Sequence, residues 1–173
     1  LARIAAAARL GPRQNILDVG TGTGILIPCL LELAGPDASI TALDFSAEML
    51  NQAKARGFPP NVSFLHADLQ NTGLPDASFH RIVCNAVFPH FTDKTRALSE
   101  IHRLLKPAGL LLISHPIGRH AVNNLHRDVG SVVAQDRVPN PSKMRALLAA
   151  ARFTNIHITD EPDFYLASAA KPA

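Results

Sequence analysis

Short apolar runs alternate with segments of helical composition along most of this chain, and that alternation limits the folds it can adopt. The runs that predict strands occupy residues 15–19, 39–43, 62–66, 79–84 and 110–114. The segments that predict helices occupy residues 1–10, 25–34, 46–55, 94–105 and 142–152. Strands that alternate with helices in this way predict a parallel sheet with helices on both faces, which is an α/β fold.

The C-terminal part of the chain departs from this alternation. Residues 156–159 and 164–168 read as a strand pair around Glu161-Pro162-Asp163, and strands joined by so short a turn must be antiparallel to each other. With the five earlier runs, this pair predicts a sheet of seven strands. A chain of 173 residues fits one domain, so residues 1–173 are expected to form a single unit.

A glycine-rich segment, residues 18–24 (DVGTGTG), links the first predicted strand to the first long helix. Ligands of open parallel sheets gather at the carboxyl ends of the strands, and glycines there let the backbone approach a ligand closely. A tight turn without a ligand is the alternative. Ile25 occupies the place of the third glycine in a dinucleotide fingerprint, and the ending of a phosphate loop is absent. Asp18 at the head of the loop suits a cationic amine and repels a pyrophosphate.

Two more acidic residues follow the next strands. Asp44 ends the second strand, about as far after Gly20 as an acid that accepts hydrogen bonds from ribose hydroxyls. Asp68 follows the third strand, where it could accept from the exocyclic amine of adenine or simply cap a loop. Acids at three successive strand ends predict one nucleoside-binding site.

These motifs are similar to those of the class I S-adenosylmethionine-dependent methyltransferases, in particular the small-molecule group of the methyltransferase type 11 kind. The matching segments are ILDVGTGTG, ITALDFSAEML, FLHADLQNTGLPDASFHRIVCNAVFPHF and EIHRLLKPAGLLLIS, which together span residues 15–114. The resemblance implies a Rossmann-like, doubly wound sheet of seven strands, mostly parallel with an antiparallel C-terminal strand. It also implies that the cofactor is S-adenosyl-L-methionine.

The resemblance further implies a set of cofactor-binding residues. Asp18, Gly20 and Gly22 would shape the pocket for the methionine part, together with Thr21 and Gly24 of the same loop, and Asp44 would hold the ribose. Phe45 and Met49 would flank the adenine or ribose, Asp68 with Leu69 would meet the adenine edge, and Asn85 with Ala86 would lie near the sulfonium end.

Some positions depart from the family pattern. His80 replaces an aspartate that usually opens the fourth strand, Ala108 replaces the first glycine of a Lys-Pro-Gly-Gly turn, and Arg152 precedes Phe153 where Gly-Phe is common. The first two changes put local turn geometry in doubt rather than cofactor binding. Few residues precede Asp18, so the N-terminal leader that covers the site in many relatives is expected to be short or truncated.

Histidines follow the fourth and fifth strands, where an acceptor would lie. His90, His115 and His126 are candidates for a base or for orienting the acceptor, because imidazole exchanges protons near neutral pH. A hydrogen-bonded structural role and metal binding are the alternatives, and no cysteine or acid completes a familiar metal-ligand spacing. Val87, Phe88 and Phe91 predict a partly apolar acceptor, unless they only pack a helix.

Composition and charge argue against several partners and favour one cellular location. The net charge of +3 is not gathered in a run, which argues against nucleic acid as a partner. The longest apolar stretch, residues 25–31, is too short to span a bilayer, and Cys29 and Cys84 read as reduced, buried residues, so a cytoplasmic location is expected. Two cysteines in core elements also argue against arsenite as the acceptor, which would need pocket thiolates.

The leading hypothesis is therefore transfer of a methyl group from S-adenosylmethionine to a small molecule. A binding or regulatory protein that keeps the cofactor site without turnover is the alternative, and a dehydrogenase is a weaker one. The sequence leaves open whether the chain forms a homodimer, which acceptor it uses and which atom of the acceptor is methylated.

Overall fold

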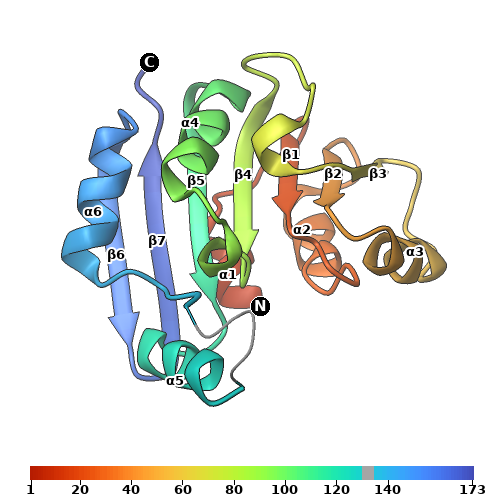
Figure 1. Ribbon diagram of the computed structural model, residues 1–173. Coiled ribbons are helices and arrows are strands. Elements are labelled where there is room, and N and C mark those ends of the chain that lie inside the picture. Colours follow the sequence, from red (N-terminus) through yellow and green to blue (C-terminus); the bar gives the residue numbers. More distant parts are fainter. Residues whose placement is uncertain (130–134) are drawn as a thin grey trace.

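The computed structural model of the protein describes residues 1–129 and 135–173 and contains one seven-stranded sheet. The strand order is β3-β2-β1-β4-β5-β7-β6, and β7 runs antiparallel to both of its neighbours (Figure 1). This confirms the predicted fold. The strands are β1 (Asn15–Val19), β2 (Ser39–Asp44), β3 (Val62–His66), β4 (Phe79–Asn85), β5 (Leu105–His115), β6 (Thr154–Glu161) and β7 (Phe164–Ala170).

Helices cover both faces of the sheet. They are α1 (Ala2–Ala7), α2 (Ile27–Ala34), α3 (Ala47–Ala55), α4 (Lys94–Leu104), α5 (Arg119–Val129) and α6 (Pro141–Ala150), with short 3₁₀ helices η1 (Leu69–Asn71) and η2 (Phe88–His90). Helices α1 and α2 share a buried cluster with one face, whereas α4, α5 and α6 share a second cluster with the other. Both faces of the central strands are therefore covered, as is usual for parallel sheets.

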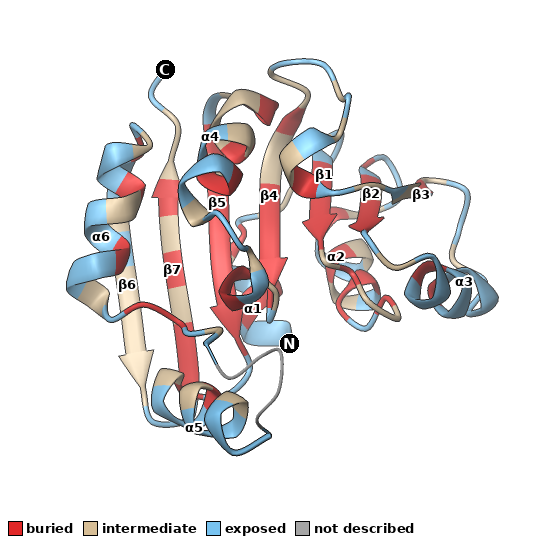
Figure 2. Cartoon of the chain, viewed as in Figure 1, coloured by how far each residue is buried: buried red, intermediate tan, exposed pale blue. Residues whose placement is uncertain are grey.

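The burial of β1 shows why a short, mostly apolar run is a good signal for a strand. Ile16 points into the cluster with α1 and α2, while Leu17 and Val19 belong to the cluster on the opposite face. Figure 2 shows the central strands largely buried and the edge strand β6 only half-buried. Because β2 and β4 both pair with β1 in parallel, the carboxyl ends of these three strands meet at one edge of the sheet.

Polar caps fix where several helices begin. The Ser46 hydroxyl accepts a hydrogen bond from the Met49 amide (3.3 Å), which confirms the predicted cap of α3. Asp93 caps α4 in the same manner. Helix α2 begins at Ile27, two residues later than predicted, and Pro28 lies in its first turn, where its missing amide hydrogen costs nothing.

Three features differ from the sequence predictions. Residues 119–129 form α5, which was not predicted, because only Val122 of this polar helix is buried. Strand β5 begins at Leu105 rather than at residue 110, and its register with β4 shifts between Phe79 and Arg81. Cys84 is buried as expected, but Cys29 is only partly buried.

Two departures from the family pattern keep the backbone shape of a glycine. Ala108 has a φ of 58° and Arg152 has a φ of 65°, both in the left-handed region that favours glycine. The turn geometry is therefore retained, at a conformational cost to each side chain. Within the described residues, no helix has the length and apolar character that crossing a membrane requires.

Candidate functional site

The glycine-rich loop lies at the carboxyl end of β1, and its three glycines, Gly20, Gly22 and Gly24, have left-handed backbones. Gly20 has a φ of 66° and Gly22 a φ of 55°. A Cβ atom at Gly20 would lie 2.4 Å from the Val87 side chain, so the loop after β4 can approach only because this residue has none. A Cβ atom at Gly22 would meet nothing within 4 Å, so the backbone there faces open space.

Asp44 ties the loop to the end of β2. One of its carboxylate oxygens accepts from the Gly22 amide (2.8 Å) and the other accepts from the Ser46 amide (2.9 Å). The Thr21 amide also donates to the Leu43 carbonyl (3.0 Å). Because a carboxylate oxygen has two lone pairs, each oxygen of Asp44 keeps one lone pair that could accept from a hydroxyl group.

Asp18 lies in a different environment from Asp44. The side chain is 1% exposed, and the Thr21 hydroxyl donates to it at 2.7 Å. Burial raises the pKa of the Asp18 carboxyl to about 7, the Thr21 hydrogen bond opposes this rise, and the negative charge of Asp44 adds to it. No cationic side chain among the described residues pairs with this carboxyl, so a cation bound here would supply the compensating charge.

Two hollows meet at Gly20 and open along this edge of the sheet. The smaller one, of about 160 Å³, is lined by Asp18, Gly20, Thr21, Gly22, Thr23, Ile25, Leu26, Asn85 and Ala86. The larger one, of about 510 Å³, is here called the cleft. Its lining residues are Val19, Gly20, Leu43, Phe45, His66, Ala67, Asp68, Leu69, Gln70, Val87, His90, Phe91 and Thr92.

Most of the predicted cofactor-binding residues lie around these hollows. Asp68 caps η1 by accepting from the Gln70 amide (2.9 Å), which is one of its two predicted roles, and it also lines the cleft. Phe45 lines the cleft and is 76% exposed, an unusual setting for an aromatic ring. Gly24, Asp44 and Met49 do not line either hollow, and Gly24 instead faces the Phe58 ring.

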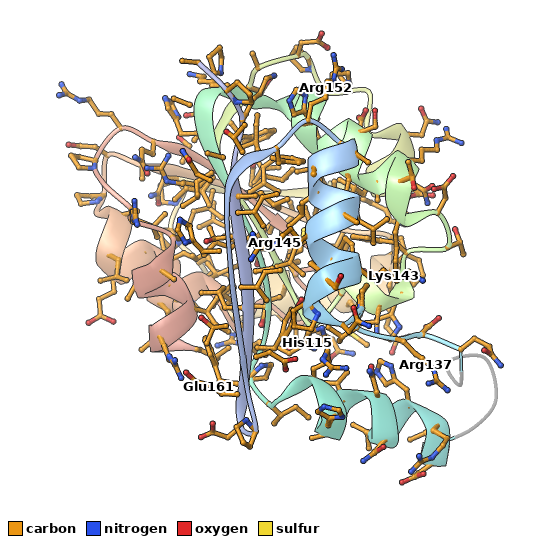
Figure 3. The ribbon with its side chains drawn as sticks, turned by 90° about the vertical axis from the view of Figure 1, so that its left-hand side faces the viewer. His115, Arg137, Lys143, Arg145, Arg152 and Glu161 are labelled. Atoms are coloured by element: carbon orange, nitrogen blue, oxygen red, sulfur yellow. The ribbon has the colours of Figure 1, made fainter. Side chains whose placement is uncertain are left out.

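The three candidate histidines lie close together but differ in setting. Only His90 lines the cleft, and its ring centroid is 5.0 Å from that of His126. His115, at the end of β5 beside α5, is buried (Figure 3). Burial, together with the nearby rings of His126 and His90, lowers the pKa of His115 to about 4, so this imidazole is a weak proton acceptor at neutral pH.

Sequence reasoning missed two residues at this site. Asp136 contacts His90, but it lies 46 positions further along the chain with no motif around it to signal the contact. His66 lines the cleft and its Nε2 lies 2.9 Å from the Phe45 carbonyl oxygen; its place at the end of β3 could have indicated this. In the described part of the chain, no group of three or more His, Cys, Asp or Glu residues is arranged to hold a metal ion.

Comparison with known proteins finds matches to the part of the chain that carries these site residues. A family model described as a methyltransferase domain matches residues 17–113, more than half of the chain. Demethylmenaquinone methyltransferase of Chlorobaculum tepidum is 40% identical over 114 residues, covering 65% of this chain and 46% of that protein. A ubiquinone/menaquinone biosynthesis C-methyltransferase of Coxiella burnetii is 34% identical over 109 residues, covering 61% and 44%. The chain thus spans about half the length of these curated relatives.

Solved structures share the fold over nearly the whole chain. A SAM-dependent methyltransferase from Aquifex aeolicus superposes with a TM-score of 0.77 at 24% identity, covering 98% of this chain and 88% of that one. Phosphoethanolamine N-methyltransferase 2 of Haemonchus contortus, solved with S-adenosyl-L-methionine, gives 0.82 at 16% identity, covering 99% and 52%. The chain therefore belongs to the methyltransferase domain family, in the class I S-adenosylmethionine-dependent group that its motifs resemble.

Proposed function

We propose that this chain binds S-adenosylmethionine along the two hollows and transfers its methyl group to a small-molecule acceptor. The observation that carries the proposal is the buried Asp18 carboxylate, which lines the smaller hollow without a cationic partner among the described residues. A ligand with an ammonium group would supply the missing positive charge. The open space above Gly22 would let such a ligand approach the backbone closely.

The remaining residues suit the other parts of the same ligand. Asp44 is held rigidly by two backbone amides and can still accept from vicinal hydroxyls. The cleft offers the exposed Phe45 ring as a stacking surface and the Asp68 carboxylate as an acceptor for an amine. These residues favour a pose with the ribose between the hollows and the adenine in the cleft.

S-adenosylmethionine supplies, when bound, an electrophilic methyl carbon attached to a positively charged sulfur. The chain's own contribution is to hold an acceptor in line with that carbon and to keep water away from it. Val87 and Phe91 beside the loop provide apolar surface for an acceptor, while His90 provides a polar group in the same cleft.

Titration calorimetry with S-adenosylmethionine and with S-adenosylhomocysteine tests the proposed binding. We expect saturable binding of both ligands to the native chain and its loss in Asp44→Ala. Because Asp44 also ties the glycine loop to β2, circular dichroism must confirm that this variant folds. Asp37→Asn, which neutralises an exposed carboxylate, is the matched control and should bind normally. Failure of the native chain to bind either ligand would refute the proposal.

Transfer itself is tested with isotopically labelled methyl groups and a panel of small-molecule acceptors. We expect label in at least one acceptor, with one equivalent of S-adenosylhomocysteine formed for each methyl group transferred. Tight binding without transfer to any acceptor would instead support a regulatory protein that keeps the cofactor site.

A further inference from the structure

A hydrogen-bonded pair of side chains at the cleft is not among the residues that the proposed function assigns to the cofactor. His90 belongs to η2, and its Nδ1 lies 2.7 Å from a carboxylate oxygen of Asp136, in the segment before α6. We infer that His90 accepts the hydroxyl proton of the acceptor and that Asp136 is the positioning residue that orients its ring. This inference rests on the proposed methyl transfer and adds a class of acceptor to it.

The contacts of Asp136 settle which nitrogens carry hydrogen. A carboxylate can only accept, so Nδ1 of His90 is the donor and, in the neutral ring, Nε2 holds the free lone pair. The backbone carbonyl of Asp136 accepts from Nδ1 of His126 at 2.6 Å, which assigns the same tautomer to that ring. Asp136 thus orients both imidazoles, one through its side chain and one through its backbone.

The His90 ring is placed to meet a ligand. It lines the cleft together with Val87 and Phe91, and its side chain is 38% exposed. Since Nδ1 is occupied by Asp136, Nε2 is the nitrogen left for an acceptor in the cleft. The Asp136 side chain, 26% exposed, would stabilise the positive charge that the ring gains with a proton, as carboxylates do beside catalytic histidines.

The chemistry of this pair indicates what kind of acceptor it serves. A base is useful only if the attacking group must lose a proton, and the apolar walls beside it favour an aromatic or enolic compound. In the step, the acceptor oxygen bonds to the methyl carbon while the carbon–sulfur bond breaks, its electron pair passing to sulfur. The hydroxyl proton passes to Nε2 of His90. We therefore assign phenolic or enolic hydroxyl compounds as the acceptor class.

A series of phenols of graded acidity tests this assignment. The native chain is incubated at about pH 8.5 with S-adenosylmethionine and phenol, 4-methoxyphenol or 4-nitrophenol, the last of which is already ionised. We expect His90→Gln to lower kcat/KM about 100-fold or more for phenol and 4-methoxyphenol, in the usual range for general-base catalysis, and less than about tenfold for 4-nitrophenol. His120→Gln, which alters an exposed histidine of α5, should leave all three rates unchanged.

The part played by Asp136 needs a readout that loss of structure would not produce. Asp136→Ala should lower kcat more than KM, and Asp136→Asn should recover part of kcat because its amide oxygen can still accept from Nδ1. In a His90→Gln background, Asp136→Ala should have little further effect, since Asp136 acts through His90. S-adenosylhomocysteine should bind all of these variants with unchanged affinity.

Three results would overturn the inference. The first is an equal loss of kcat/KM for all three phenols in His90→Gln. The second is a loss of kcat from Asp136→Ala that is as large in the His90→Gln background as in the native chain. The third is no transfer to any phenol by a native chain that binds S-adenosylhomocysteine. Absence of S-adenosylhomocysteine binding would instead count against the proposed function, so the two failures are distinguishable.

Discussion

Replacing Asp18 with asparagine is expected to stabilise the free chain at alkaline pH while weakening its binding of the cofactor. The pKa of Asp18 is about 7 in the folded chain, against an ordinary value of 3.8. Folding therefore favours the protonated carboxyl, and its contribution to stability falls as pH rises between these two values. At about 1.4 kcal/mol per pKa unit, the ionised carboxylate costs the folded chain about 4 kcal/mol above pH 7.

Urea unfolding at about pH 5.5 and pH 8.5 measures this effect. Between these pH values, the native chain should lose about 2 kcal/mol of unfolding free energy relative to Asp18→Asn, because the folded carboxyl keeps its proton up to about pH 7 whereas the unfolded one has already lost it. The amide oxygen that this substitution introduces can still accept from the Thr21 hydroxyl, so the local structure should survive. Asp37→Asn, which removes an exposed carboxylate, should show no such relative change. An equal pH dependence in native and Asp18→Asn chains would refute the reasoning.

Two further substitutions test the packing and the backbone at positions that line neither hollow. Tyr165→Phe should raise the free energy of unfolding by about 1 kcal/mol, because the buried Tyr165 hydroxyl has no hydrogen-bond partner among the described residues. A decrease of similar size in the free energy of unfolding, measured with urea, would contradict this. Ala108→Gly should raise the melting temperature and increase the free energy of unfolding by about 0.5–1 kcal/mol, because glycine adopts a φ of 58° without steric strain. An unchanged or lower melting temperature would show that the turn carries no strain.

The early strands could be predicted from sequence because local signals define both of their ends. The first strand, residues 15–19, is a run buried on both faces, bounded by a loop on one side and glycines on the other, and its bounds agree with β1. The polar helix α5 gave no such signal, since only Val122 is buried and position in the fold, rather than spacing, decides its conformation. The predicted fifth strand began too late because Lys106-Pro107 is typical of a turn. In the structure, pairing of Leu105 with Phe79 extends β5 to the N-terminal side of these two residues.

Part of the candidate site could likewise be predicted from sequence, and part could not. The acids at the strand ends could be placed together from sequence, because parallel strands bring their carboxyl ends to one edge. The contact between His90 and Asp136 could not be predicted, because it joins η2 to the segment before α6 through a single hydrogen bond. Neighbouring residues around Asp136 have no periodicity that would fix their position.

The structure also shows that two acids at neighbouring strand ends have different surroundings. Asp44 receives two backbone amides and is prepared for hydroxyl groups before any ligand arrives. Asp18 receives one hydroxyl donor and is buried, so its charge is unfavourable until a cation joins it. If the ligand brings that cation, binding must be accompanied by loss of the Asp18 proton near neutral pH. The residue that destabilises the free chain would then be the one that favours a positively charged ligand over a neutral one.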